Sequence, residues 1–206
     1  MRRRYLGFAR AAIPLGLMLA AGWPAVWAAG GGVTSSTDLR SYAVGGTTAL
    51  GLVRAMDTHP LQGDHGAAYA NIHPDYQLSL ATRQRGGLCV PSSVSVHVDF
   101  DLTLPVAANP GGMSARTRAA WDGFTAFARA HEMHHKASYI GCATAFVTQA
   151  RRHSASECFA LQSTIRGMLA EMKRDCEAKQ VPFDREQARV VANLRLFNMA
   201  RVQSLR

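Results

Sequence analysis

The sequence predicts an α+β domain in which a small antiparallel sheet packs on one long helix, with two further helices toward the C-terminus. Val94 to Leu104 alternates apolar and polar residues, the period of two that is typical of a half-buried strand. From Ser114 to about Arg152, apolar residues recur at three- and four-residue steps, as they do along one side of a helix. Strand patterns precede helical patterns along the chain, which favours an α+β order.

The first 28 residues have the layout of a secretory signal peptide. Four arginines within the first ten residues form a basic start, an apolar run follows over residues 11–21, and small residues lead to Ala28. The run is short for a bilayer span and contains Pro14, so we expect cleavage after Ala28 rather than a membrane anchor. The predicted product is a periplasmic or secreted protein without a stable membrane span.

The overall charge is basic, but much of the excess lies in the leader. Removal of its four arginines would lower the formal net charge from +9 to +5. The remaining sequence lacks dense Lys/Arg clusters with interleaved aromatic residues, the pattern typical of nucleic-acid binding. We therefore expect no nucleic-acid partner.

Short elements are expected before the main strand. Residues 29–40, rich in Gly, Ser and Thr, are predicted to be a flexible mature N-terminus, and residues 41–206 are predicted to form the folded domain. Tyr42 to Val44 is a short strand, and Thr47 or Thr48 caps a helix that ends at His59-Pro60. Residues 61–75 are expected to be mostly loop, followed by a strand over residues 76–80 and a turn at residues 85–87.

Three helices complete the prediction. The longest runs from Ser114 to about Arg152, and a second runs from Ser156 to about Gln180. Pro182 is expected to interrupt the second helix, so that a third begins at Asp184. The residues predicted to face inward on the second helix are Phe159, Ile165, Leu169 and Met172.

One motif in the long helix points to chemistry. His131-Glu132-Met133-His134-His135 contains the His-Glu-x-x-His pattern, and side chains four residues apart lie on the same helix face. His131 and His135 are therefore predicted to bind one Zn²⁺ ion, with Glu132 as the general base of a zinc metallopeptidase acting on protein or peptide substrates. His134 is interpreted as a flanking residue.

A catalytic zinc also needs a third protein ligand. The extended pattern with Gly and a further His downstream is absent, because Ser138 and Gly141 occupy those positions. Glu171 is our choice, since Asp175 lies four residues on with the spacing of a supporting carboxylate. Three alternatives remain: Glu157, His153 and Asp184.

The four cysteines are Cys89, Cys142, Cys158 and Cys176, all after the leader. An even number in an exported chain predicts two disulfides, and three connectivities are open. A cysteine zinc site is disfavoured because the sequence contains no Cys-x-x-Cys pair.

Several matches fall in the order found in one known family. They are Tyr42-x-Val44-x-Gly46 with a Leu52/Met56 helix, Cys89-Val90 before a strand ending Leu104-Pro105, Trp121-x-x-Phe124 before the His-Glu motif, Cys158-x-x-Leu161, and Phe183-Asp184. On these residues the chain resembles the predicted secreted zinc-dependent proteases of bacteria, a family of otherwise unknown function. The resemblance implies zinc, peptide-bond hydrolysis and export. It also implies pairing of Cys89 with Cys158, which leaves Cys142 for Cys176. The predicted fold, a small sheet on a long helix that carries the motif, is classed as zincin-like.

The chain departs from that family near its C-terminus. After Phe183-Asp184 the family has Thr, His and Gly where this chain has Gln187, Arg189 and Val190. Two alternatives to a protease follow: a catalytically degenerate, zincin-like binding module of the envelope, which the departure favours, and a zinc hydrolase acting on a non-peptide amide. Glu132 disfavours the first, because a pure binding site has no use for a base.

Overall fold

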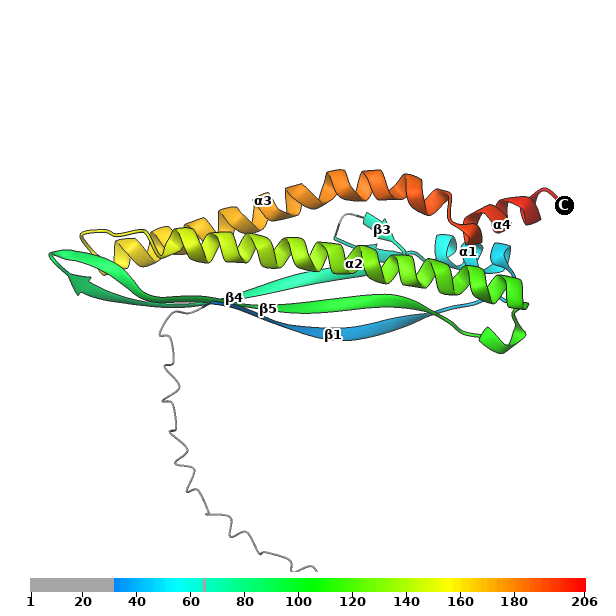
Figure 1. The fold of residues 1–206 in the computed structure, drawn as a ribbon, viewed down its shortest axis with the longest axis horizontal. Coiled ribbons are helices and arrows are strands. Elements are labelled where there is room, and N and C mark those ends of the chain that lie inside the picture. The colour runs from blue at the N-terminus through cyan, green and yellow to red at the C-terminus, as the bar shows by residue number, and fades with distance from the viewer. Residues whose placement is uncertain (1–31, 65) are drawn as a thin grey trace, which may run out of the picture.

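The computed structural model describes residues 32–64 and 66–206, and these form an elongated molecule with a sheet on one side and helices on the other (Figure 1). The predicted signal peptide lies outside the described residues. Four helices and five strands are present among the described residues. In the same part of the chain, no helix is both long and apolar enough to cross a membrane.

The main sheet has three strands in the order β1-β5-β4: β1 (Val33–Val44), β5 (Leu88–Ala107) and β4 (Asn71–Arg85). β4 and β5 are antiparallel, as predicted, but β1 runs parallel to β5. The prediction of an antiparallel sheet was therefore wrong for one edge. After β1 the chain passes through α1 (Ala49–Thr58) and the short strands β2 (Leu61–Gly63) and β3 (Gly66–Ala68), so it enters the sheet again at the opposite edge.

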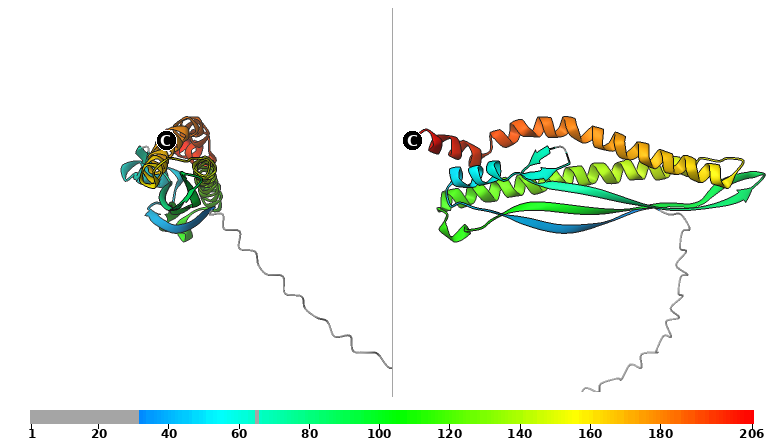
Figure 2. Two further views of the ribbon diagram at one scale, coloured as in Figure 1. Left: turned by 90° about the vertical axis from the view of Figure 1, so that its left-hand side faces the viewer. Right: turned by 180° about the vertical axis from the view of Figure 1, so that it is seen from behind.

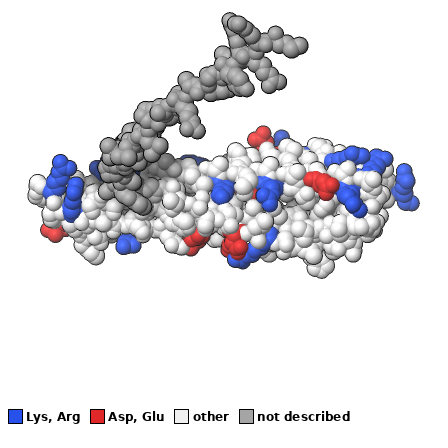
Figure 3. All heavy atoms as spheres, turned by 60° about the horizontal axis from the view of Figure 1, so that its bottom comes forward, with Lys and Arg blue, Asp and Glu red and all other residues white. Residues whose placement is uncertain are grey.

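β1 corrects the expected flexible N-terminus over residues 29–40. Residues 33–40 lie within β1, whereas residues 29–31 lie outside the described residues. The polar side chains of this strand have cross-strand partners: Thr34 Oγ1 lies 2.7 Å from His97 Nδ1, and Arg40 Nη2 lies 3.0 Å from Asp101 Oδ1. Figure 3 shows charged side chains of both signs spread along this side of the molecule. A polar composition is thus compatible with an edge strand whose surface is wet.

The long β4–β5 hairpin extends the predicted strands in both directions. Residues 61–75 are not mostly loop, because β2, β3 and the first part of β4 occupy them. The predicted turn is confirmed: Gly86 and Gly87 have φ angles of 59° and 79°, which a two-residue hairpin turn requires and which glycine adopts at little cost. The inward residues of β5 are buried, as the alternation predicted: Val94, Val96, Val98, Phe100 and Leu102.

α2 (Ala115–Ala150) is the predicted long helix, and the Ser114 hydroxyl caps it by accepting from the Thr117 amide at 3.1 Å. Its N-terminal part packs with α1 and α4 (Arg195–Ser204) in one hydrophobic cluster that includes Phe124. Its C-terminal part packs on the sheet in a second cluster, which includes Tyr139. The turns that carry the His-Glu motif lie between these two clusters.

α3 (Cys158–Ala192) packs along α2 on the same side of the sheet, and Figure 2 shows this from the end and from behind. Pro182 does not interrupt it, and the helix continues to Ala192, with Asn193 as its C-cap. A proline removes one helical hydrogen bond, but here the ring is exposed and the neighbouring turns are held by contacts with α2. Phe159, predicted to face inward, is 84% exposed, while Ile165 is buried as expected.

Both implied disulfides are present. Cys89–Cys158 joins the start of β5 to the start of α3, and Cys142–Cys176 joins α2 to α3. Backbone hydrogen bonds between Cys89 and Ala155, at 2.7 and 3.1 Å, add a further tie between the sheet and the α2–α3 connection. Two disulfides are typical of proteins exported from the cytoplasm.

Loss of the interhelical disulfide should destabilise the fold. The Cys142→Ala/Cys176→Ala variant removes a disulfide that joins residues 34 positions apart. Because the unfolded chain then gains conformational entropy, the free energy of unfolding should fall by about 3–4 kcal/mol. Urea unfolding of the oxidised variant, compared with oxidised wild type, measures this. An unchanged unfolding midpoint would show that the bond contributes nothing to stability.

Candidate metal site

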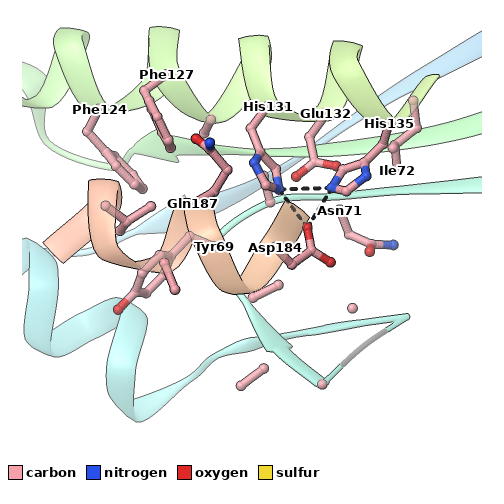
Figure 4. A pocket seen from close by; sticks show the side chains of 18 of the residues that line it. Tyr69, Asn71, Ile72, Phe124, Phe127, His131, Glu132, His135, Asp184 and Gln187 are labelled. Carbon is pink, nitrogen blue, oxygen red and sulfur yellow. Dashed lines mark hydrogen bonds and ion pairs between the residues drawn. The ribbon is translucent and has the colours of Figure 1, made fainter. Parts of the chain in front are cut away.

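Three side chains from two helices meet in the gap between the hydrophobic clusters. His131 and His135 lie one turn apart on α2, with their Nε2 atoms 2.9 Å apart. Asp184 approaches from α3, and its Oδ1 lies 2.8 Å from His135 Nε2 and 3.3 Å from His131 Nε2 (Figure 4). The donor atoms of the three residues all lie within 4.8 Å of one another.

The ligand types of this group match those of zinc sites, and the distances between its donor atoms are close to those that zinc requires. Two imidazole nitrogens and a carboxylate oxygen are ligands that zinc takes in catalytic sites, which use three protein ligands and keep one position open. Tetrahedral ligands about 2.1 Å from zinc lie roughly 3.4 Å from each other. The separations of 2.8, 2.9 and 3.3 Å therefore need to widen by only a few tenths of an ångström.

Glu171, our predicted third ligand, does not reach the site. It is exposed, and it precedes Asp184 by 13 residues on the same helix, a distance of about 20 Å. Asp184, one of the three alternatives, takes its place in the cluster. The sequence placed Asp184 on a separate helix after Pro182. Because α3 continues through that proline, Asp184 lies instead beside the motif on α2.

Gln180 fixes the orientation of His135, and sequence reasoning missed it. Its Oε1 accepts from His135 Nδ1 at 3.0 Å, while its Nε2 donates to Ser138 Oγ at 3.0 Å and to the Cys176 carbonyl at 2.7 Å. With the proton on Nδ1, the Nε2 lone pair of His135 faces the site, as metal binding requires. No local pattern marks an amide for this role, because it depends on how α3 packs against α2.

Phe183 packs beside the histidines. Its ring stacks on His131 at a centroid distance of 5.0 Å and on His134 at 4.0 Å. His134 is exposed and is not in the metal-binding group, in agreement with its interpretation as a flanking residue. Since Phe183 directly precedes Asp184, this stacking also positions the carboxylate.

Glu132 is buried next to the group, with 4% of its surface exposed. Burial raises the pKa of its carboxyl group to about 7, although the neighbouring His131 and His135 and the Ile72 backbone amide favour the charged form. A cation bound by the histidines would add to that opposing effect. A carboxyl group whose pKa lies near neutrality is suited to take and return a proton.

The electrostatics of the other two groups also fit a cation site. Burial alone would raise the pKa of Asp184, but its hydrogen bonds to His131 and His135 hold it below the ordinary value. For His135, burial lowers the pKa and contacts with Asp184 and Gln180 raise it, with a net increase. Asp184 is thus ionised at neutral pH, and metal binding would have to displace the proton through which His135 contacts it.

A cavity of about 470 Å³ opens at the site. Glu132, both histidines and Asp184 line one part of it, and the β2–β3 hairpin and the start of β4 form the facing wall (Figure 4). The rest of the lining is largely apolar and lies toward α4. The cavity size lies in the roughly 300–1,000 Å³ range of small-molecule and substrate sites.

Comparison with known proteins identifies a family without assigning an activity. The model of a family described as bacterial protein of unknown function (DUF922) matches residues 39–190, which include all the residues of the candidate metal site. No curated protein and no solved structure matches the chain.

Proposed function

The chain belongs to the DUF922 family of bacterial proteins of unknown function, and we propose that it is an exported zinc-dependent metallopeptidase that hydrolyses peptide bonds. One observation carries the proposal: the donor atoms of His131, His135 and Asp184 converge beside the buried Glu132, at the wall of a cavity. The helix that carries the motif lies against a small sheet, which supports a zincin-like classification.

The roles of the residues follow from their chemistry. His131, His135 and Asp184 would hold the ion, which would supply Lewis-acid chemistry: it would lower the pKa of a water molecule toward neutrality and polarise the carbonyl group under attack. Glu132 takes the proton of the attacking water and delivers it to the leaving amine. Gln180 and Phe183 keep the histidines oriented.

The presence of Asp184 in the group answers the main argument for a degenerate binding module. That alternative rested on the missing family histidine near Arg189, but two histidines and an aspartate could supply three ligands without it. Burial of a carboxyl group such as Glu132 costs folding free energy, which a catalytic role explains and simple metal storage does not. Peptide and non-peptide amides share the same chemistry, so substrate screening separates them.

The zinc content of the purified protein is the first test of the proposal. The mature protein from Ala29 onward, purified oxidised, should contain about one zinc per chain, and His135→Ala should lose it because the variant keeps only two of the three ligands. His153→Ala is the matched control: it removes an exposed imidazole beyond the end of α2 that is not part of the group of possible metal ligands, and it should keep the metal. Metal analysis and hydrolysis of a mixed peptide library, with cell-wall amides in parallel, provide the readouts.

Wild-type protein that takes up no zinc after reloading would contradict the metal site. Bound zinc combined with cleavage of cell-wall amides alone would contradict the assignment to peptides.

A further inference from the structure

The cavity continues beyond the metal site along the groove between α2 and α3. Phe127 and Phe124 line it one and two turns before His131 on α2. Ala188 and Val191 line it one and two turns after Asp184 on α3. Because these positions precede the site on one helix and follow it on the other, both helices line the same side of the metal group. We call this part of the cavity the apolar pocket.

The walls of the apolar pocket are rigid and wide. Tyr69, Phe124 and Phe197 pack on one another with ring centroids 5.4 to 5.9 Å apart. The Tyr69 hydroxyl also donates to Asp57 at 2.9 Å, which fixes that ring. Many of the other residues that line the cavity are small, and these are Ala67, Ala68, Ala70, Ala128, Ala188 and Ala192. The lining also includes Gln187, Val191 and Arg201. Small residues beside fixed rings leave space that the protein's own side chains do not fill.

We propose that the apolar pocket binds a large apolar side chain, aromatic or branched aliphatic, of the residue adjacent to the bond that is hydrolysed. This inference rests on the proposed function, because it assumes that the bound substrate is hydrolysed. The apolar pocket itself does not depend on that assumption. A substrate whose amide lies at Glu132 and the metal group must place a neighbouring side chain within the same cavity. Aromatic walls reward burial of apolar surface, and they penalise a charged side chain that would lose its water.

The expected selectivity follows from the same contacts. A Phe side chain buries far more apolar surface than an Ala side chain, so binding and kcat/KM should favour Phe over Ala at this position by at least about tenfold. The preference should apply to one position of the substrate only, because the apolar pocket lies on one side of the metal group.

Ala188→Trp is the variant that tests the apolar pocket. Ala188 is exposed at the helix surface yet lines the cavity, so a large side chain there fills the space without disturbing a buried core. Ala178→Trp is the matched control, because Ala178 is an exposed alanine of the same helix that is not part of the lining. Both variants are compared with wild type by zinc content and by urea unfolding.

Binding is measured without turnover, in zinc-loaded protein that also carries Glu132→Gln. Titration with N-acetyl-phenylalanine amide and N-acetyl-alanine amide, followed by NMR, should show at least about tenfold tighter binding of the first. Ala188→Trp should reduce that ratio to near one, and Ala178→Trp should leave it unchanged. In parallel, kcat/KM is measured on peptides that differ only at the residue beside the cleaved bond.

The two readouts separate the two proposals. Selective binding that Ala188→Trp removes, without hydrolysis of any peptide by wild type, would keep the apolar pocket and discard the peptidase. Hydrolysis of peptides with equal rates for Phe and Ala at both positions beside the bond would keep the peptidase and overturn the apolar pocket. Equal binding of the two amides, or a ratio that survives Ala188→Trp, would also overturn it.

Discussion

Replacing Glu132 with Gln should lower kcat/KM for peptide hydrolysis by about a hundred- to ten-thousandfold and leave about one zinc per chain in place. The amide has nearly the same shape as the carboxyl group and fills the same buried space, so the fold should persist. The glutamine amide, unlike a carboxylate, cannot take a proton from the attacking water. Zinc should remain because the proposed ligands are His131, His135 and Asp184 and do not include Glu132.

The control for Glu132→Gln is Glu186→Gln, which removes an exposed carboxylate two residues from Asp184. Both variants are assayed for zinc content, peptide hydrolysis and urea unfolding. Glu186→Gln should retain wild-type activity. Activity near the wild-type level in Glu132→Gln would remove the proposed mechanism, and zinc loss in that variant would mean that Glu132 is a ligand rather than a base.

Elements with a strong local pattern could be predicted from the sequence. The alternation over Val94–Leu104 gave β5, and the stripe after Ser114 gave α2, because burial of one face forces that period on the sequence. The motif could be predicted for the same reason. Four-residue spacing on a helix places His131 and His135 on one face whatever the rest of the fold does.

Elements stabilised by a distant partner could not be predicted in this way. β1 has a polar sequence and forms a strand because β5 supplies its hydrogen bonds and cross-strand pairs. Pro182 lies inside α3, although proline normally ends a helix. Contacts with α2 and the neighbouring helical turns stabilise α3 by more than the loss of one backbone hydrogen bond destabilises it. Phe159 shows the opposite error: its apolar side chain was predicted to face inward, but it lies near the start of α3 and is not covered by the described residues.

The proposed third ligand shows both what a local pattern can predict and what depends on distant packing. Glu171 was chosen for its spacing to Asp175. That argument is local and does not predict which residues of the following helix contact α2. Asp184 was available as an alternative, and Phe183-Asp184 matched the family pattern, so a signal for it existed in the sequence. Its position on α3 depends on the antiparallel packing of two long helices, which the sequence does not encode at short range.

Asp184→Ala should therefore lose zinc, and Glu171→Ala should keep it. Removal of a direct ligand should weaken zinc binding by more than the roughly 10–100-fold that loss of an outer partner costs, so metal should not survive dialysis. Removal of the carboxylate also leaves two imidazoles 2.9 Å apart without the negative charge that lies beside both of them. Zinc affinity measured by competition with a chelator gives the size of the effect.

Asp184→Asn separates the loss of charge from the loss of shape. The amide keeps the size of the side chain and one oxygen donor but carries no negative charge, so its zinc affinity should fall between those of wild type and Asp184→Ala. Glu171 is exposed and about 20 Å away, so its removal should change neither zinc affinity nor hydrolysis. Zinc retained in Asp184→Ala but lost in Glu171→Ala would show that the metal is held elsewhere, and the site built on His131, His135 and Asp184 would have to be abandoned.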